Sequence, residues 1–276
     1  MLDVGYSMFN NFQFSIVMIK LAFSPCPNDT FIFDALVHNK IDTEGLEFDF
    51  VMADVEELNR MVLHEEADMI KISYSTYLNV LASYALLESG GAFGYGNGPV
   101  LVAKTEIPFQ QVRHYKVALP GEHTTAHLLF RIAFPASNRK YFMVFSKIEE
   151  SILKGETDAG VIIHEGRFTY ERKGLKKILD LGEFWQKLTS TPVPLGCIVA
   201  QKNLGHEMIA RLNRIMRRSV EYAMANREDV MPFVRQNAQE MERDVMLKHI
   251  NFYVNDLTLD AGETGRKAVA ALLNFI

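Results

Sequence analysis

The fold and the candidate chemistry of this chain are both indicated by Asp158-Ala-Gly-Val-Ile-Ile-His-Glu-Gly-Arg-Phe-Thr-Tyr170. Three apolar residues, Val161 to Ile163, lie between Gly160 and Gly166, a pattern typical of a strand buried on both faces of a parallel sheet. The run ends at His164. Ligands collect beyond the carboxyl ends of strands in open α/β sheets, so we expect His164 to face a cleft and to exchange a proton near neutral pH. The alternative is a half-buried histidine that is hydrogen-bonded to a neighbour.

The composition indicates a globular chain that binds neither nucleic acid nor membrane. Its 276 residues suit one large domain or two of about 100–150 residues each. The formal charge of -5 provides no basic excess for a phosphate backbone. A helically spaced basic group is typical of a solvated helix face, and consists of Arg211, Arg214, Arg217 and Arg218. No apolar run approaches the roughly 18 residues that a membrane span needs.

The cysteines and the amino terminus predict a reduced, cytoplasmic setting. Cys26 and Cys197 are far apart and lack zinc-ligand spacing, so neither a disulfide scaffold nor a metal site is indicated. The segment from Met1 to Val17 has no basic residue before its apolar ones and is a poor secretory signal. We expect residues 1–17 to be a disordered tail or an over-long start assignment.

Strand-like and helix-like segments alternate in the first third of the chain, which predicts a mostly parallel α/β sheet. The expected strands are 19–23, 46–51 and 68–73, and the expected helices are 31–39, 54–65 and 74–84. Asn28 or Asp29 is a suitable N-cap for the first helix. The free backbone amides in the first turn of that helix could bind an anion. The glycine-rich segment 89–99 indicates a tight loop but has no nucleotide-binding frame.

The same plan begins again after Lys116, which predicts a second lobe. The segment 117–126 aligns with the segment 21–30, and this alignment places Thr125 opposite Thr30. Similarly, 153–163 matches 63–73, with Asp158 on Asp68.

Two similar apolar segments, 100–104 and 197–202, flank the second unit and are expected to be the paired strands by which the chain crosses between lobes. This is the plan of a two-lobed, periplasmic-binding-protein-like (type II) α/β fold with a ligand cleft between hinged lobes. The predicted division is 18–103 plus 201–276 for lobe one and 104–200 for lobe two. Predicted helices over 205–226, 229–236, 240–252 and 263–275 complete lobe one.

Strand and loop ends of both lobes should converge on the cleft. The candidate substrate-binding residues are Asn28, Thr30, Lys71, Ile72, Ser73, Gly90, Gly91, Thr124, Thr125 and Ala126, with His164 as the catalytic candidate. Hydroxyls, helix-start amides, one lysine and one histidine suit an anionic small molecule and a single acid/base residue. The threonines are equally compatible with a turn and an N-cap. No nucleophile elbow is present, and Cys26 as a nucleophile beside His164 is the remaining alternative for covalent chemistry.

Several motifs together resemble the 1,4-dihydroxy-6-naphthoate synthases of the futalosine route to menaquinone. They are Ser24-Pro-Cys-Pro-Asn-Asp-Thr30-Phe, Ser89-Gly-Gly-Ala, Gly121 followed by His123-Thr-Thr-Ala126, Ile162-Ile-His-Glu165 with Arg167-Phe-Thr-Tyr170, and Pro194-Leu-Gly196. The resemblance runs from about Leu21 to the last helix. It implies a cofactor-free lyase that converts cyclic dehypoxanthine futalosine to 1,4-dihydroxy-6-naphthoate and dihydroxyacetone. It also implies that His164 is the proton acceptor and that Lys71 to Ser73 and Thr125 with Ala126 contact the substrate.

This chemistry fits the residues. An aryl carboxylate needs amide and hydroxyl donors, and proton removal beside a carbonyl needs one base, for which a histidine with a pKa near ~6.5 is suited. Two other functions stay open. A solute-binding protein would share the fold but should carry an export signal. The chorismate dehydratase of the same pathway shares the fold as well, although the motifs around Cys26 and His164 favour the naphthoate synthase.

Overall fold

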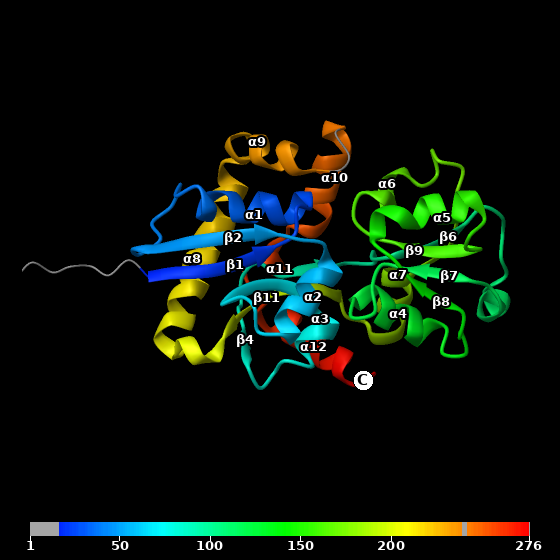
Figure 1. Ribbon diagram of the computed structural model, residues 1–276, viewed down its shortest axis with the longest axis horizontal. Coiled ribbons are helices and arrows are strands. Elements are labelled where there is room, and N and C mark those ends of the chain that lie inside the picture. The colour runs from blue at the N-terminus through cyan, green and yellow to red at the C-terminus, as the bar shows by residue number, and fades with distance from the viewer. Residues whose placement is uncertain (1–16, 239–241, 276) are drawn as a thin grey trace, which may run out of the picture.

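Two α/β lobes lie side by side in the computed structural model, which describes residues 17–238 and 242–275 (Figure 1). The expectation for the amino terminus lies outside the described residues as far as residue 16, whereas Val17 already opens the first strand. The predicted helix start at Glu240 also falls outside them.

Lobe one is built on a mixed sheet. Its strands run in the order β2 (Leu46–Met52), β1 (Val17–Phe23), β3 (Met69–Ser73), β11 (Val193–Gln201) and β4 (Tyr84–Leu86), and β5 (Ala92–Gly94) also pairs with β11. β1 is parallel to β2 and β3, while β11 is antiparallel to each of its partners. The helices α1 (Pro27–Val37), α2 (Val55–Leu63) and α3 (Tyr74–Tyr77) follow the first three strands.

Lobe two repeats this arrangement. Its strands run in the order β10 (Lys176–Asp180), β6 (Val100–Ala103), β9 (Ala159–Ile162), β7 (Val117–Leu119) and β8 (Lys140–Phe142). β7 is parallel to β8 and β9, and β6 is antiparallel to β9 and β10. Its helices are α4 (Thr125–Ala133), α5 (Ile148–Lys154), α6 (Gly166–Thr169) and α7 (Leu181–Thr189). Both sheets are therefore mixed, not mostly parallel as expected.

The internal repeat is confirmed by strand order and by one recurring contact. The order β2-β1-β3-β11 in lobe one corresponds to β8-β7-β9-β6 in lobe two. Asp68 accepts a hydrogen bond from the backbone N–H of Lys20 at 2.8 Å, and Asp158 accepts one from Lys116 at 2.7 Å. The two aspartates aligned by sequence thus fix the central strand of each lobe in the same way.

The crossing strands differ from the prediction. β6 and β11 do not pair with each other, because β6 joins the second sheet beside β9 and β11 joins the first beside β3. Each occupies the same position in its own lobe, which explains their similar apolar sequences. Sheet membership places the crossings before β6 and before β11, earlier than the boundaries at 104 and 201.

Two predicted elements change in extent. Helix α1 begins at Pro27, where the missing N–H costs nothing, and its N-cap is Cys26, not Asn28 or Asp29. The predicted helix 74–84 ends at Tyr77, and Tyr84 enters β4 instead. Pairing with β11 and a hydrogen bond from the Tyr84 hydroxyl to the Ala67 carbonyl override the helical spacing.

The carboxyl-terminal helices complete lobe one, as predicted. They are α8 (His206–Ala225), α9 (Arg227–Asn237), α10 (Arg243–Tyr253), α11 (Asp256–Leu259) and α12 (Gly262–Leu273). In Figure 1, α8, α9 and α10 lie on the side of α1, and α12 lies near the junction of the lobes.

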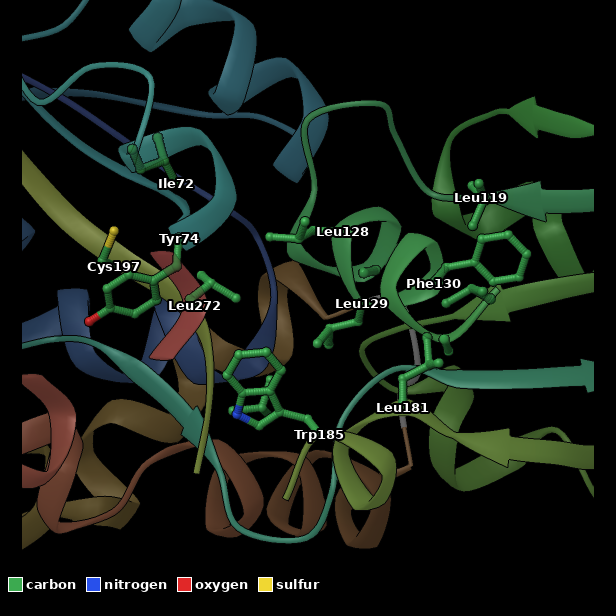
Figure 2. Close-up of a cluster of buried hydrophobic side chains, with 14 of the residues drawn as sticks. Ile72, Tyr74, Leu119, Leu128, Leu129, Phe130, Leu181, Trp185, Cys197 and Leu272 are labelled. Carbon is green, nitrogen blue, oxygen red and sulfur yellow. The ribbon is translucent and has the colours of Figure 1, made fainter. Parts of the chain in front are cut away.

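One apolar cluster continues from lobe to lobe (Figure 2). Tyr74 and Cys197 of the first sheet region join Leu129 of α4 and Trp185 of α7 in this cluster. The junction is therefore a shared core, which holds the two lobes in a defined relation around the space between them.

Candidate active site

A pocket lies between the lobes, with a volume of about 700 Å³ including the part open to solvent. This volume is in the range of small-molecule sites. Its lining comes from both lobes and comprises Ser24, Asn28, Asp29, Val55, Leu58, Lys71, Ile72, Ser73, Ala92, Pro99, Thr124, Thr125, Ala126, Ile163, His164, Leu195, Gly196 and Tyr253.

His164 is held at the pocket wall just beyond the end of β9. Its backbone has a φ of +54°, an uncommon conformation for a residue other than glycine and one that turns the chain sharply. The residue is half-buried, and its Nε2 atom is buried without a hydrogen-bond partner among the described residues. Phe145 contacts the ring edge to face with centroids 4.6 Å apart, and His249 stacks on it at 6.0 Å.

Burial sets the protonation state of His164. Desolvation lowers its pKa to about 4, and the nearby negative charge of Asp29 opposes that shift only in part. The pKa near 6.5 expected from the sequence is therefore wrong for the unliganded protein. The imidazole is neutral at pH 7 and has a lone pair available for a proton.

The amino-terminal turn of α4 presents unused donors to the pocket. Thr124 is the N-cap, and its hydroxyl oxygen accepts from the backbone N–H of His127 at 3.2 Å. The Thr125 hydroxyl donates to the carbonyl of Leu195 at 2.9 Å. The backbone amides of Thr125 and Ala126 have no partner in the described part of the chain, as expected for the first turn of a helix. These two amides are thus the available anion donors.

Lys71 is 6% exposed, and its ammonium group pairs with other groups of the protein. Its Nζ lies 3.1 Å from Asp29 Oδ1 and donates to the carbonyl of Gly90 at 2.6 Å. The other Asp29 oxygen accepts from the Ser24 hydroxyl at 2.7 Å. The lysine and aspartate form a buried pair in the pocket lining that fixes the glycine-rich segment against β3.

Most residues predicted for the site lie together. Those that line the pocket are Asn28, Lys71, Ile72, Ser73, Thr124, Thr125, Ala126 and His164. Thr30, Gly90 and Gly91 are not in the lining. The Thr30 hydroxyl donates to the Cys26 carbonyl, Gly90 provides the carbonyl that Lys71 binds, and Gly91 lies against Phe93, where a Cβ would approach the ring to 2.9 Å.

Sequence reasoning missed Tyr253 and His249, which both come from α10. Tyr253 lines the pocket, and His249 is fully buried behind it with Nε2 2.8 Å from Asn28 Oδ1. Burial lowers the pKa of His249 well below the ordinary value, and His164 opposes its charge further. No sequence signal marked this helix, whereas Ser24 and Gly196 lie within motifs already singled out.

A possible ligand cluster was also missed. Cys26, His164 and Glu165 each offer one ligand atom, and these atoms lie within 4.8 Å of one another. The sequence indicated no metal cluster, because the residues are about 140 positions apart and meet only when the lobes do. Burial raises the pKa of the Cys26 thiol well above its usual range, which disfavours this cysteine as a nucleophile.

Comparison with known proteins places the chain in a family. The family model described as menaquinone biosynthesis matches residues 19–276. The chain belongs to the menaquinone biosynthesis family. Two relatives, each named 1,4-dihydroxy-6-naphthoate synthase, come from Thermus thermophilus (43% identity) and Streptomyces coelicolor (41% identity). Both alignments cover 92% of this chain, with 92% and 91% of the relatives covered.

Solved structures share the fold of this chain. A crystal structure of an Archaeoglobus fulgidus protein is 33% identical, with a TM-score of 0.89 and 94% and 96% of the two chains covered. The periplasmic aliphatic sulphonate-binding protein of Escherichia coli is 11% identical, with a TM-score of 0.62 and coverages of 94% and 88%. The predicted periplasmic-binding-protein-like fold is thus confirmed. Within the described residues, no helix is both long and apolar enough to cross a membrane.

Proposed function

We propose that this protein converts cyclic dehypoxanthine futalosine to 1,4-dihydroxy-6-naphthoate and dihydroxyacetone. The names of the two relatives support this reaction. The observation that carries the proposal is a neutral histidine and a pair of free helix amides that line one pocket between two lobes.

The substrate carboxylate is proposed to bind at the start of α4. The amides of Thr125 and Ala126 point out of the helix end, where the helix dipole favours an anion. A carboxylate bound there would accept hydrogen bonds from these two backbone amides, which have no other partner in the described part of the chain. Lys71 contributes positive charge to the pocket, although Asp29 compensates for it.

His164 is proposed to remove the proton beside the substrate carbonyl. Because its ring is neutral at pH 7, no proton must be lost before it acts. The electron pair left by the proton drives cleavage of the carbon–carbon bond, and formation of the aromatic ring favours that cleavage. A bound anion near the ring would raise the pKa of His164 above its unliganded value and strengthen it as a base.

The experiment mixes the purified protein with cyclic dehypoxanthine futalosine, without added metal or cofactor, and follows naphthoate by mass and fluorescence. We expect product from the wild-type protein. Tight binding of a small carboxylate without turnover would instead support a solute-binding role, and product from chorismate would support the dehydratase.

The His164→Asn variant tests the base directly. We expect kcat to fall by at least ~100-fold while substrate affinity changes little, because general base catalysis typically contributes 10²- to 10⁴-fold. The matched control is His38→Asn, which alters the C-cap histidine of α1, a residue that does not line the pocket. Near wild-type turnover of His164→Asn would remove this residue from the mechanism.

The proposed setting is the cytoplasm, and the proposed partner is the anionic substrate alone. The biosynthetic names of the relatives support the setting. Cell fractionation with an antibody to the protein tests it, and recovery of the protein in a secreted fraction would contradict the proposal.

A further inference from the structure

The cluster of Cys26, His164 and Glu165 joins the two lobes behind the pocket wall. Cys26 is the N-cap of α1 in lobe one, whereas His164 and Glu165 follow β9 in lobe two. Their ligand atoms lie within 4.8 Å of one another. Cys26 is 5% exposed and Glu165 is 3% exposed, and neither lines the pocket, while His164 does. The histidine is therefore shared between the substrate pocket and the cluster.

The chemistry of these three groups matches one class of metal ion. A thiolate, an imidazole and a carboxylate are the ligands of Zn²⁺, which takes four ligands at about 2.0–2.3 Å. The three ligand atoms lie within 4.8 Å of one another, whereas atoms bound to one tetrahedral zinc ion lie closer together. Zinc binding would therefore draw the lobes or side chains slightly inward. Three protein ligands leave a fourth position for water.

One ring nitrogen of the histidine in this cluster lacks a hydrogen-bond partner. Nε2 of His164 is buried and has no hydrogen-bond partner among the residues that the structure describes. An unpaired buried nitrogen is costly, and a metal ion would relieve that cost.

We propose that Cys26, His164 and Glu165 form an inhibitory zinc site that bridges the two lobes. Binding forms bonds from Zn²⁺ to the sulfur, the imidazole nitrogen and a carboxylate oxygen, and the thiol proton passes to solvent. The inhibition rests on the proposed role of His164 as the base. A bound ion occupies the imidazole and holds the lobes together, so the enzyme would neither accept a proton nor exchange substrate and product.

The binding test uses Co²⁺ as a spectroscopic substitute for Zn²⁺ on the metal-free, full-length protein under reducing conditions. We expect one equivalent of Co²⁺ to produce a thiolate-to-cobalt charge-transfer band in the near ultraviolet, and Zn²⁺ to displace it. The chain provides a matched pair of variants because it has two cysteines. Cys26→Ala should abolish the band, whereas Cys197→Ala, in the apolar core away from the cluster, should retain it.

Substitution of Cys26 should leave the fold intact, since this N-cap makes no side-chain capping hydrogen bond. Cys26→Ser is a second variant that keeps the size of the side chain, and it should also lose the band. Equal bands in the Cys26 and Cys197 variants, or no band in the wild-type protein, would overturn the zinc site.

The activity test compares inhibition by Zn²⁺ in each variant with that variant's own metal-free rate. We expect Zn²⁺ to inhibit the wild-type protein and Cys197→Ala, EDTA to restore activity, and Cys26→Ala to need at least tenfold more Zn²⁺. Failure of the proposed reaction would leave the cobalt band in place, so the two proposals fail separately. Equal inhibition of all variants would assign the effect to another zinc site and overturn the proposed inhibition.

Discussion

His164 combines features that pull in opposite directions. Its half-buried imidazole is desolvated, which makes it a weaker proton acceptor than a solvated one, but it is wholly neutral at physiological pH. The strained backbone at φ +54° and the contact with Phe145 fix the ring before substrate arrives. We infer that the protein favours a positioned, unprotonated ring over intrinsic basicity, and that the substrate's own charge restores part of the basicity.

The pH dependence of activity follows from this lowered pKa. The acid limb of kcat/KM reports groups of the free enzyme, so we expect it to fall with a midpoint close to pH 4, not 6.5. Proton NMR of the histidine ring resonances, with His164→Asn to assign the signal, measures the same group directly. A ring that titrates at pH 6 or above would contradict the burial argument.

Stability should also change with pH below 6.5. The pKa values of His164 and His249 are lower in the folded state than in the unfolded chain. At a pH between the folded and the unfolded pKa values, the unfolded chain therefore binds more protons than the folded protein. The free energy of unfolding should therefore decrease as the pH falls from about 6.5 toward 4. Urea titrations at a series of pH values measure it, and His249→Asn should flatten the dependence.

The sequence predicted most of the individual residues that line the pocket, but fewer of the residues that pack around it. The segment 71–73 forms the end of β3 and His164 lies just beyond β9, so the rule that ligands gather at strand ends was sufficient to find both. His249 and Tyr253 are on a helix far along the chain whose apolar spacing looks ordinary. The lowered pKa of His164 depends on packing from both lobes, which no local pattern contains.

Among the elements, α4 bears directly on binding. Its first turn is both capped by Thr124 and open to the pocket, so the cap leaves the Thr125 and Ala126 amides for a ligand. The predicted N-cap role for Thr124 is confirmed, and the Thr125 hydroxyl is already used to reach Leu195 on β11. We therefore assign the anion contact to the backbone and not to the hydroxyls.

A pair of substitutions separates these contributions. Thr125→Pro removes the amide at the first helical position, where proline is tolerated and where the preceding Thr124 is already extended. Thr125→Val keeps the amide and removes the hydroxyl. By calorimetry, Thr125→Pro should weaken substrate binding beyond Thr125→Val by roughly 1.5–3 kcal/mol, the loss expected for a hydrogen bond to a charged group. Equal affinities of the two variants would place the carboxylate elsewhere.

Element extents were less predictable than element order. The predicted helix 54–65 begins at its N-cap Asp54, whose carboxylate accepts from two backbone amides of α2. Cap chemistry is local and visible in the sequence. The short α3 was overestimated because β11, which pairs with β4, lies more than 100 positions later in the chain.

For the molecule as a whole, the lobes are in contact around the pocket. Glu56 of α2 accepts from the backbone N–H of His123 at 3.0 Å and meets its Nδ1 at 2.7 Å. Elsewhere, Arg167 of lobe two lies over the ring of Phe252 in α10, 4.6 Å from its centroid. These contacts indicate a closed arrangement, so substrate entry requires at least one of them to open.

Weakening the contact at Glu56 should favour the open form. Glu56→Gln loses the charge that faces His123, and we expect KM to rise about two- to tenfold with a smaller change in kcat, as for loss of about 0.5–1.5 kcal/mol. The control is Glu57→Gln, an exposed neighbour on the same helix. Small-angle scattering without substrate should show a larger radius of gyration only for Glu56→Gln. A similar response from both variants would indicate that Glu56 does not hold the lobes.

The two crossings of the chain between the lobes also matter while the protein is being made. Lobe two runs without interruption from β6 to β10, so its sheet can form as soon as that segment leaves the ribosome. The first sheet must wait for β11, and until then β3, buried along its whole length in the finished fold, has one open edge. Because an unpaired apolar edge invites pairing with other chains, the nascent protein is most prone to aggregate during the interval between synthesis of β3 and of β11.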